Sequence, residues 1–237
     1  MTRWSPRRRW RRCCAMAETI LVSGGSGGIG AAVCDALAAR GFIPVVGYAG
    51  NREAAEAVAD RTGGGILHLD LTSDASITAA TAALAAMESP PVGLVLAGSP
   101  PPEIEPFGKI SPEAMALQWQ VNVAGPQRLL AGVVKSCFRP RKSGRVLGVL
   151  TSALAEPGKP AAGSMGAYVI AKAGLAGLLD ALAADYGWLT VRSVRPGYTE
   201  TPMLKAFDER YLEMMRERSP FSTPEQVAAD IVDELLR

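Results

Sequence analysis

Short apolar runs alternate with helical stretches along nearly the whole chain, and this alternation constrains the fold more than any other feature. Continuously apolar runs are typical of strands that are buried on both faces. Six such runs are present, at Thr19–Ser23, Phe42–Tyr48, Ile66–Leu71, Val92–Leu96, Val146–Thr151 and Val191–Val194. Strands separated by helices of about 10–15 residues form βαβ units, which build a parallel sheet with helices on both faces. The pattern predicts one doubly wound α/β domain whose ligand lies at the carboxyl ends of the strands.

Composition narrows the function classes. The chain of 237 residues contains a single histidine, His68, which excludes zinc sites built on several imidazoles. The cysteines show no CxxC spacing, as expected of reduced thiols in a cytoplasmic protein; they are Cys13, Cys14, Cys34 and Cys137. The single histidine and the cysteine spacing therefore predict no metal site. We find no apolar run of membrane-spanning length, so we do not predict a membrane protein.

Residues 1–15 differ from the rest of the chain. They carry six arginines and no acid, which accounts for more than the whole net charge of +2. The slightly acidic remainder argues against a nucleic-acid surface. A basic arm can bind phosphates or an anionic membrane, but no apolar pattern accompanies the arginines. We therefore expect a disordered, dispensable extension, with Met16 as an alternative start, followed by a catalytic domain over residues 16–237.

A glycine-rich loop directly follows the first predicted strand, with the sequence Ser23-Gly24-Gly25-Ser26-Gly27-Gly28-Ile29-Gly30. Such a loop between a strand and a helix lets the backbone approach a pyrophosphate, whose charge the free N–H groups of the helix can meet. The segment Gly24–Gly28 also fits the G-x-S-x-G nucleophile elbow of hydrolases. That mechanism needs a histidine late in the chain, whereas His68 lies in an early strand, so a hydrolase is disfavoured.

Further motifs follow the loop in a characteristic order. Tyr168-Val-Ile-Ala-Lys172 is a Tyr-x-x-x-Lys motif, and Pro196-Gly197 with Thr201 is a Pro-Gly segment. Together with the loop they resemble the short-chain dehydrogenase/reductase family, over about Thr19 to Ala229, and most of all its 3-oxoacyl-carrier-protein reductases. The resemblance implies a Rossmann-type fold and a nicotinamide cofactor. It implies that the cofactor contacts Ser23, Gly24, Ser26, Gly28, Ile29, Gly30, Asp70, Leu71, Ala97, Gly98, Tyr168, Lys172, Pro196, Gly197 and Thr201.

The catalytic chemistry suits these residue types. Tyr168 and Lys172 are four residues apart and share one helix face, so the ammonium group is expected to lower the pKa of the phenol toward neutrality. The tyrosine then serves as general acid or base. The resemblance implies that Asn122 supports a water in a proton relay. It also implies a serine after the fifth strand, for which we favour Ser152, with Thr151 as the alternative.

Two departures from the family pattern stand out. Val95-Leu96-Ala97-Gly98 replaces the Asn-Asn-Ala-Gly that often follows the fourth strand, so two polar side chains become aliphatic. We also expect the sheet to lack the final strand that usually follows the last long helix, since the sequence given ends at Arg237.

The cofactor and substrate are less constrained. No acid stands at the end of the second strand, where one would bind the 2′-hydroxyl of NAD, and Asn51 and Arg52 could instead meet a 2′-phosphate. We expect NADP, with NAD as the alternative. The apolar residues of the segment 203–222 suit a lid over a hydrophobic or acyl-like carbonyl substrate, either free or linked to an acyl carrier.

Two other function hypotheses remain open, namely a regulator that binds NADP without turnover and an alcohol dehydrogenase that uses NAD. For assembly, we expect a homodimer built on the two long helices, with a tetramer as the alternative. Its apolar candidates are Leu117, Val121, Leu129, Leu130, Val133, Ala171, Leu175, Leu178 and Leu179.

Overall fold

Six strands pair into one parallel sheet in the computed structural model, which describes residues 17–237. They are β1 (Thr19–Ser23), β2 (Ile43–Tyr48), β3 (Gly65–His68), β4 (Gly93–Leu96), β5 (Gly144–Val149) and β6 (Leu189–Val194). The spatial order is β3-β2-β1-β4-β5-β6, so the direction of the winding reverses between β1 and β4. The prediction of a doubly wound α/β fold is confirmed. The predicted N-terminal extension lies outside the described residues.

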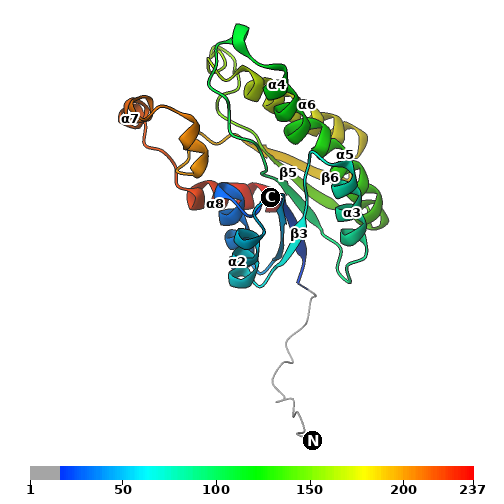
Figure 1. Cartoon of the computed structure of the whole chain (residues 1–237). Coiled ribbons are helices and arrows are strands. Elements are labelled where there is room, and N and C mark those ends of the chain that lie inside the picture. The colour runs from blue at the N-terminus through cyan, green and yellow to red at the C-terminus, as the bar shows by residue number, and fades with distance from the viewer. Residues whose placement is uncertain (1–16) are drawn as a thin grey trace, which may run out of the picture.

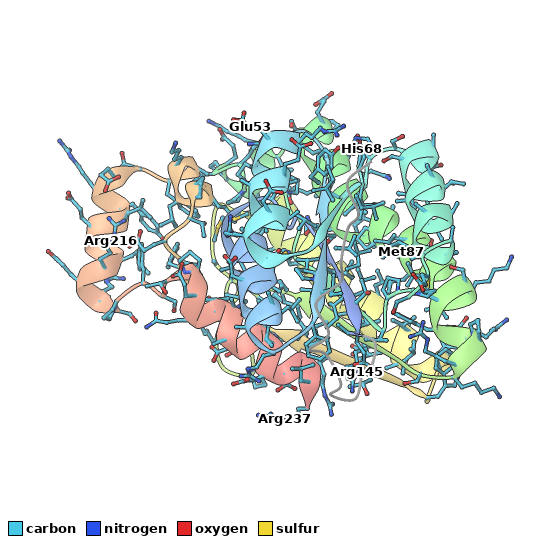
Figure 2. All side chains as sticks on the ribbon, turned by 90° about the horizontal axis from the view of Figure 1, so that it is seen from below. Glu53, His68, Met87, Arg145, Arg216 and Arg237 are labelled. Carbon is cyan, nitrogen blue, oxygen red and sulfur yellow. The ribbon has the colours of Figure 1, made fainter. Side chains whose placement is uncertain are left out.

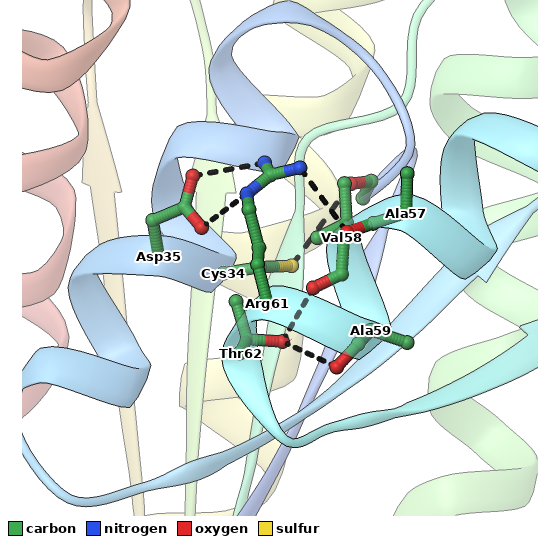
Figure 3. A network of polar contacts seen from close by, with 8 residues as sticks. Cys34, Asp35, Ala57, Val58, Ala59, Arg61 and Thr62 are labelled. Atoms are coloured by element: carbon green, nitrogen blue, oxygen red, sulfur yellow. Dashed lines mark hydrogen bonds and ion pairs between the residues drawn. The ribbon is translucent and has the colours of Figure 1, made fainter.

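Helices cover both faces of this sheet (Figure 1). They are α1 (Gly28–Ala39), α2 (Arg52–Thr62), α3 (Asp74–Ala85), α4 (Pro112–Trp119), α5 (Gly125–Val133), α6 (Gly166–Asp185), α7 (Glu209–Arg218) and α8 (Pro224–Leu236). Buried side chains of α1, α2 and α8 form one core cluster with the sheet, and those of α3, α5 and α6 form the other. Arg61 on α2 reaches both carboxylate oxygens of Asp35 on α1, at 2.8 and 2.9 Å, and this ion pair ties the two helices together (Figure 3).

The helix boundaries follow local sequence signals. Ser111 accepts a hydrogen bond from the N–H of Ala114 and thereby caps α4, with Pro112 in the first turn. Gly63 ends α2 in a left-handed conformation with φ of 66°. The third strand is shorter than predicted and ends at His68, so Asp70 and Leu71 lie in the loop beyond it.

The helical run from Pro112 to Phe138 contains two π-helical turns that the sequence did not reveal. They span Gln120–Ala124 and Val134–Phe138, on either side of α5. Single π turns inside helices are frequent at functional sites because they change the direction in which the side chains point. The first of these turns carries Asn122.

The prediction that no apolar run reaches membrane-spanning length is wrong for helix α6. By length and composition alone, its 20 residues could cross a membrane. In the structure, α6 packs against β5, β6 and α4. Its buried face includes Ala171, Leu175 and Leu179, which therefore belong to the core and cannot form the predicted dimer surface. The same holds for Leu129, Leu130 and Val133 on α5.

Helix α7 stands beside the rest of the domain, on the side of α8 (Figures 1 and 2). Arg216 on α7 forms ion pairs with Glu200 and Glu209, both at 3.2 Å. Among the described residues no strand follows β6, so this strand forms an edge of the sheet, and α8 packs against it.

Candidate active site

The glycine loop between β1 and α1 is built so closely that side chains are excluded. A Cβ atom on Gly30 would lie 2.2 Å from the carbonyl oxygen of Gly24, which is backbone and cannot move aside. Gly24 itself has φ of 68°, and a Cβ there would lie 2.6 Å from the Cα of Gly98. Helix α1 then begins with no side-chain cap and no acid in its first turn. Its free N–H groups and positive dipole end therefore suit an anionic group.

Two distant segments close around this loop. The N–H of Gly98, just after β4, donates to the Ser23 hydroxyl at 3.4 Å. Thr201, in the segment after β6, lies so close that a Cβ on Gly28 would be 3.0 Å from its methyl group. The structure thus brings together three segments that the sequence assigned to the cofactor, although they are far apart in the chain.

A cavity of about 570 Å³ extends from Ile29 and Ala97 near the loop to Phe221 in the lid segment, residues 203–222. It lies at the carboxyl ends of the strands, as predicted for a doubly wound sheet. The described side chains that line it include two charged ones, Lys159 and Lys172, and no acid. The cavity wall is therefore apolar with a positive bias.

Lys172 is buried on α6 and donates from Nζ to the carbonyl oxygen of Val149 at 2.8 Å. Burial lowers the pKa of this ammonium group to about 7. The Nζ atom lies 5.7 Å from the centre of the ring of Tyr168, which precedes Lys172 by one turn of α6. The predicted proximity of the two side chains is therefore confirmed.

The predicted direction of the tyrosine shift is wrong in this structure. Burial raises the pKa of Tyr168, and the ammonium group of Lys172 does not reverse this effect. The hydroxyl of Thr151 acts in the opposite direction and lowers the pKa of the phenol. Desolvation outweighs the effect of this hydroxyl because the phenol is mostly removed from water.

Thr151 and Ser152 follow β5 and face different neighbours. Thr151 is buried beside Tyr168, and its hydroxyl oxygen accepts from the N–H of Ala153 at 3.2 Å. The Ser152 hydroxyl lies toward Gly197, 3.7 Å from where a Cβ of that glycine would be, and its N–H donates to the carbonyl of Pro196. Both residues line the cavity, but the geometry favours Thr151 as the hydroxyl that acts with Tyr168.

Asn122 is buried in the first π-helical turn. Its side-chain nitrogen donates to the backbone carbonyl and to the side-chain oxygen of Gln118, both at 3.0 Å. Its own oxygen, Oδ1, is buried without a partner among the described residues. A buried acceptor of this kind costs free energy unless a donor such as a water occupies it. This observation fits the predicted support of a water.

Other predicted residues lie away from the cavity. Asp70 accepts from the N–H and the hydroxyl of Thr72 at 2.8 and 2.7 Å, and these bonds lower the pKa of its carboxyl group. The Asn51 side chain caps α2, and the neighbouring Arg52 pairs with Glu56 at 2.8 Å. Leu71 is buried in the core, and its backbone carbonyl accepts from Gln120.

The departures from the family pattern also find an explanation. Val95 and Leu96, which replace the two asparagines, are buried in opposite core clusters and so stabilise β4 by apolar packing.

His68 lies at the end of β3 beside Tyr48 and Ser76. Within residues 17–237, no group of three or more His, Cys, Asp and Glu residues could hold a metal ion.

Sequence reasoning missed two parts of the site. Gln118, near the end of α4, is buried and bonds to Asn122, although a glutamine in an amphipathic helix gives no signal of burial. Tyr198 contacts three aromatic rings of the lid segment, and its hydroxyl lies 2.7 Å from that of Tyr211. These three rings belong to the predicted lid segment, but no signal in the sequence showed that Tyr198, which precedes the lid, packs among them.

Known proteins are similar to this chain in sequence and in fold. A family model described as enoyl-(acyl carrier protein) reductase matches residues 24–232. The acetoacetyl-CoA reductase of Paracoccus denitrificans is 31% identical over 225 residues, which cover 92% of this chain and 90% of that enzyme. The 3-oxoacyl-[acyl-carrier-protein] reductase FabG of Escherichia coli (strain K12) is 31% identical over 193 residues, 80% of this chain and 76% of its own. The crystal structure of levodione reductase has a TM-score of 0.82 at 22% identity, covering 92% of this chain and 90% of that one, and so shares the fold.

Proposed function

Because this chain belongs to the short-chain dehydrogenase/reductase family of NAD(P)-dependent oxidoreductases, we propose that it reduces the ketone of a 3-oxoacyl-like substrate with NADPH. The family acts on the pair formed by an alcohol and its carbonyl compound. The observation that carries the proposal is the cluster of Tyr168, Lys172 and Thr151 in the cavity beside the glycine loop. The hypothesis of a non-catalytic regulator loses support, because the similar proteins are enzymes.

The chain's own residues handle the proton. When bound, the reduced nicotinamide supplies a hydride to the carbonyl carbon, and negative charge develops on the carbonyl oxygen. Tyr168 donates its phenolic proton to this oxygen. The raised pKa of Tyr168 keeps the phenol protonated at neutral pH, and this is the form that can act as the general acid.

The residues around Tyr168 orient the substrate and resupply the proton. We assign Thr151 to the substrate oxygen, since its hydroxyl can donate there while facing the phenol, and Ser152 is the alternative. Lys172 has a pKa of about 7 and so exchanges a proton readily near neutrality. The unpartnered Oδ1 of Asn122 suits a water that continues the relay.

The cofactor fits the loop for steric reasons. Gly24 and Gly30 leave no room for side chains, so the backbone N–H groups of α1 can approach a pyrophosphate. We assign Ser23, Ser26, Gly28, Ile29, Ala97, Gly98, Pro196, Gly197 and Thr201 to the same cofactor. NADP is preferred to NAD because no acid ends β2 and the exposed Arg52 lies close to Tyr48, the last residue of that strand. Asp70 and Leu71 remain candidates for the adenine end.

The substrate class follows from the cavity wall. Its substrate end is lined by apolar and aromatic side chains that include Met203, Leu204, Phe207, Met215 and Phe221. The two lysines and the absence of lining acids disfavour a cationic substrate. An acyl chain that carries a thioester-linked anionic carrier satisfies both features, which agrees with the names of the similar enzymes.

We propose a homodimer that pairs α4 and α6. Leu117, Trp119 and Ile170 on these helices are 46%, 45% and 37% exposed, although they are large and apolar. Small apolar residues extend the exposed stripe along α6, at Ala173, Gly177, Ala181 and Ala184. Such a stripe lets two helices approach closely, and a second copy of the chain would bury it. Cys34 and Cys137 are free thiols, which suits the reducing cytoplasm as the proposed location.

The test of the function is Tyr168→Phe, which keeps the ring and removes the acid. Turnover of a 3-oxoacyl thioester with NADPH should fall at least ~10²-fold, while NADPH binding measured by fluorescence titration stays unchanged. The matched control is Tyr186→Phe, at the other end of α6, where the ring packs on Trp188 outside the cavity. Undiminished turnover in Tyr168→Phe would contradict the assignment.

A further inference from the structure

Gln118 is buried where a long polar side chain is costly to bury. Only 3% of its surface is exposed, in the last turn of α4. Its side-chain nitrogen donates to the carbonyl oxygen of Pro101 at 2.9 Å and more weakly to that of Pro100 at 3.4 Å. Its side-chain oxygen accepts from the Asn122 nitrogen at 3.0 Å. Both ends of the amide are therefore satisfied.

The two prolines determine which way this amide points. A carbonyl oxygen can only accept, so the NH₂ group of Gln118 must face Pro100 and Pro101. The oxygen of Gln118 must then face Asn122, which can answer it only with its own NH₂ group. The Asn122 nitrogen is held again by the backbone carbonyl of Gln118 at 3.0 Å. Each orientation thus follows from the one before it.

These hydrogen bonds determine the direction of the side-chain oxygen of Asn122. Because the Asn122 nitrogen is committed, its Oδ1 points the other way and is buried without a partner among the described residues. An acceptor is thereby presented at a fixed position, where it can take a hydrogen bond from a water or another donor. At the other end of these hydrogen bonds, beside Pro100 and Pro101, the neighbouring residues Ser99 and Pro102 line the cavity.

We propose that Gln118 is a positioning residue that fixes the polarity of Asn122 and couples it to the wall of the cavity at Pro100–Pro102. This role rests on the proposed function, in which Asn122 supports the water of the proton relay. Gln118 does not touch the reacting atoms. It acts by excluding the flipped orientation of Asn122, in which the NH₂ group instead of the oxygen would face the relay.

The decisive variant is Gln118→Glu, which keeps the shape and changes the polarity. An ionised carboxylate cannot donate to Pro101, whereas a protonated one has a single O–H donor and a carbonyl acceptor, as the amide does. Burial raises the pKa of such a carboxyl group. At pH 8 kcat should fall about tenfold, less than for Tyr168→Phe because Gln118 only positions. The ratio of variant to wild-type kcat should recover between about pH 8 and pH 5 as the carboxylate takes up its proton.

Two further variants separate positioning from structure. Gln118→Leu lacks both donor and acceptor, so its kcat should stay low at every pH. Gln120→Glu is the matched control, because Gln120 lies in the same π-helical turn as Asn122 and donates to the Leu71 carbonyl at 3.2 Å, with no hydrogen bond to Asn122 among the described residues. Its kcat relative to wild type should not depend on pH.

The melting temperature provides a readout that needs no turnover. Burial raises the pKa of the introduced carboxyl group in the folded state above its value in the unfolded state. The variant therefore keeps its full stability below the unfolded pKa of this group, and it loses stability as pH rises through the folded pKa. The melting temperature of Gln118→Glu should therefore fall from pH 5 to pH 8 relative to wild type. If this fall occurs while kcat and its pH dependence match wild type, Gln118 is only structural and the inference is overturned. If wild type reduces no carbonyl compound, the proposed function fails, whatever the melting curves show.

Discussion

The glycine loop and the proposed catalytic cluster are built on different physical principles. At the glycine loop, residues 23–30, the backbone atoms are so close that one added carbon collides at Gly24 or Gly30. At the catalytic cluster, which consists of Thr151, Tyr168, Lys172 and Asn122, the limiting quantity is the pairing of buried polar groups. The comparison teaches that the loop is sensitive to volume, whereas the cluster is sensitive to polarity at constant volume. Each region should therefore tolerate the kind of change that damages the other.

The largest effect is expected from adding one methyl group to the loop in Gly30→Ala. The new Cβ would lie 2.2 Å from the carbonyl oxygen of Gly24, so the loop must shift and NADPH binding should be lost. We expect a loss of about 3 kcal/mol of stability, which lowers the melting temperature by roughly 6–12 °C in a domain of this size. Gly27→Ala is the stability control, because a Cβ there meets nothing within 4 Å. Equal melting temperatures for the two variants would refute the volume argument.

The second effect is a change of polarity in the catalytic cluster by Lys172→Met. Turnover should fall at least ~10²-fold because the proton relay loses its amine, yet the protein should become more stable at pH 7 and below. Burial lowers the pKa of Lys172 to about 7 in the folded state, well below its ordinary value. The stability penalty of burying the charge is therefore greatest below pH 7, and it fades as pH rises toward the unfolded pKa.

Melting curves from pH 6 to pH 10 check this prediction. The gain in melting temperature over wild type should shrink steadily as pH rises. Lys135→Met, at an exposed lysine outside the cavity, should show no such trend. A variant of Lys172 that is less stable than wild type at pH 6 would mean that the ammonium group is better solvated than its burial indicates.

The third effect separates the two hydroxyls that follow β5. Thr151→Val keeps the shape and removes the hydroxyl that faces Tyr168, so kcat should fall about tenfold or more. Ser152→Ala should change kcat less than about threefold, since its hydroxyl lies toward Gly197. Steady-state kinetics with one 3-oxoacyl thioester decide between them. The reverse order of effects would restore Ser152 as the partner of Tyr168.

The smallest effect concerns the adenine side of the cofactor. Arg52→Ala should raise KM for NADPH several-fold and leave that for NADH almost unchanged, since only NADPH carries the 2′-phosphate. Stability should change little, because the ion pair of Arg52 with Glu56 lies at the surface. An equal change in both KM values would mean that Arg52 does not meet the phosphate.

Features that depend on neighbours along the chain could be predicted from the amino-acid sequence. The six strands, the end of α2 at Gly63, the cap at Ser111 and the glycine loop follow from apolar periodicity, capping and the lack of a Cβ, which are local properties. The Tyr-x-x-x-Lys spacing likewise placed Tyr168 and Lys172 on one helix face.

The pairing and desolvation of polar groups depend instead on the packing of segments that are distant in the chain. This packing set the direction of the pKa shift of Tyr168, because burial of the phenol raises the pKa more than the hydrogen bond with Thr151 lowers it. It turned Thr151 instead of Ser152 toward the phenol, and it connected Pro101, Gln118 and Asn122 through hydrogen bonds. These outcomes depend on which surfaces meet in space, and a pattern along the chain does not record the solvent that each polar group loses on folding.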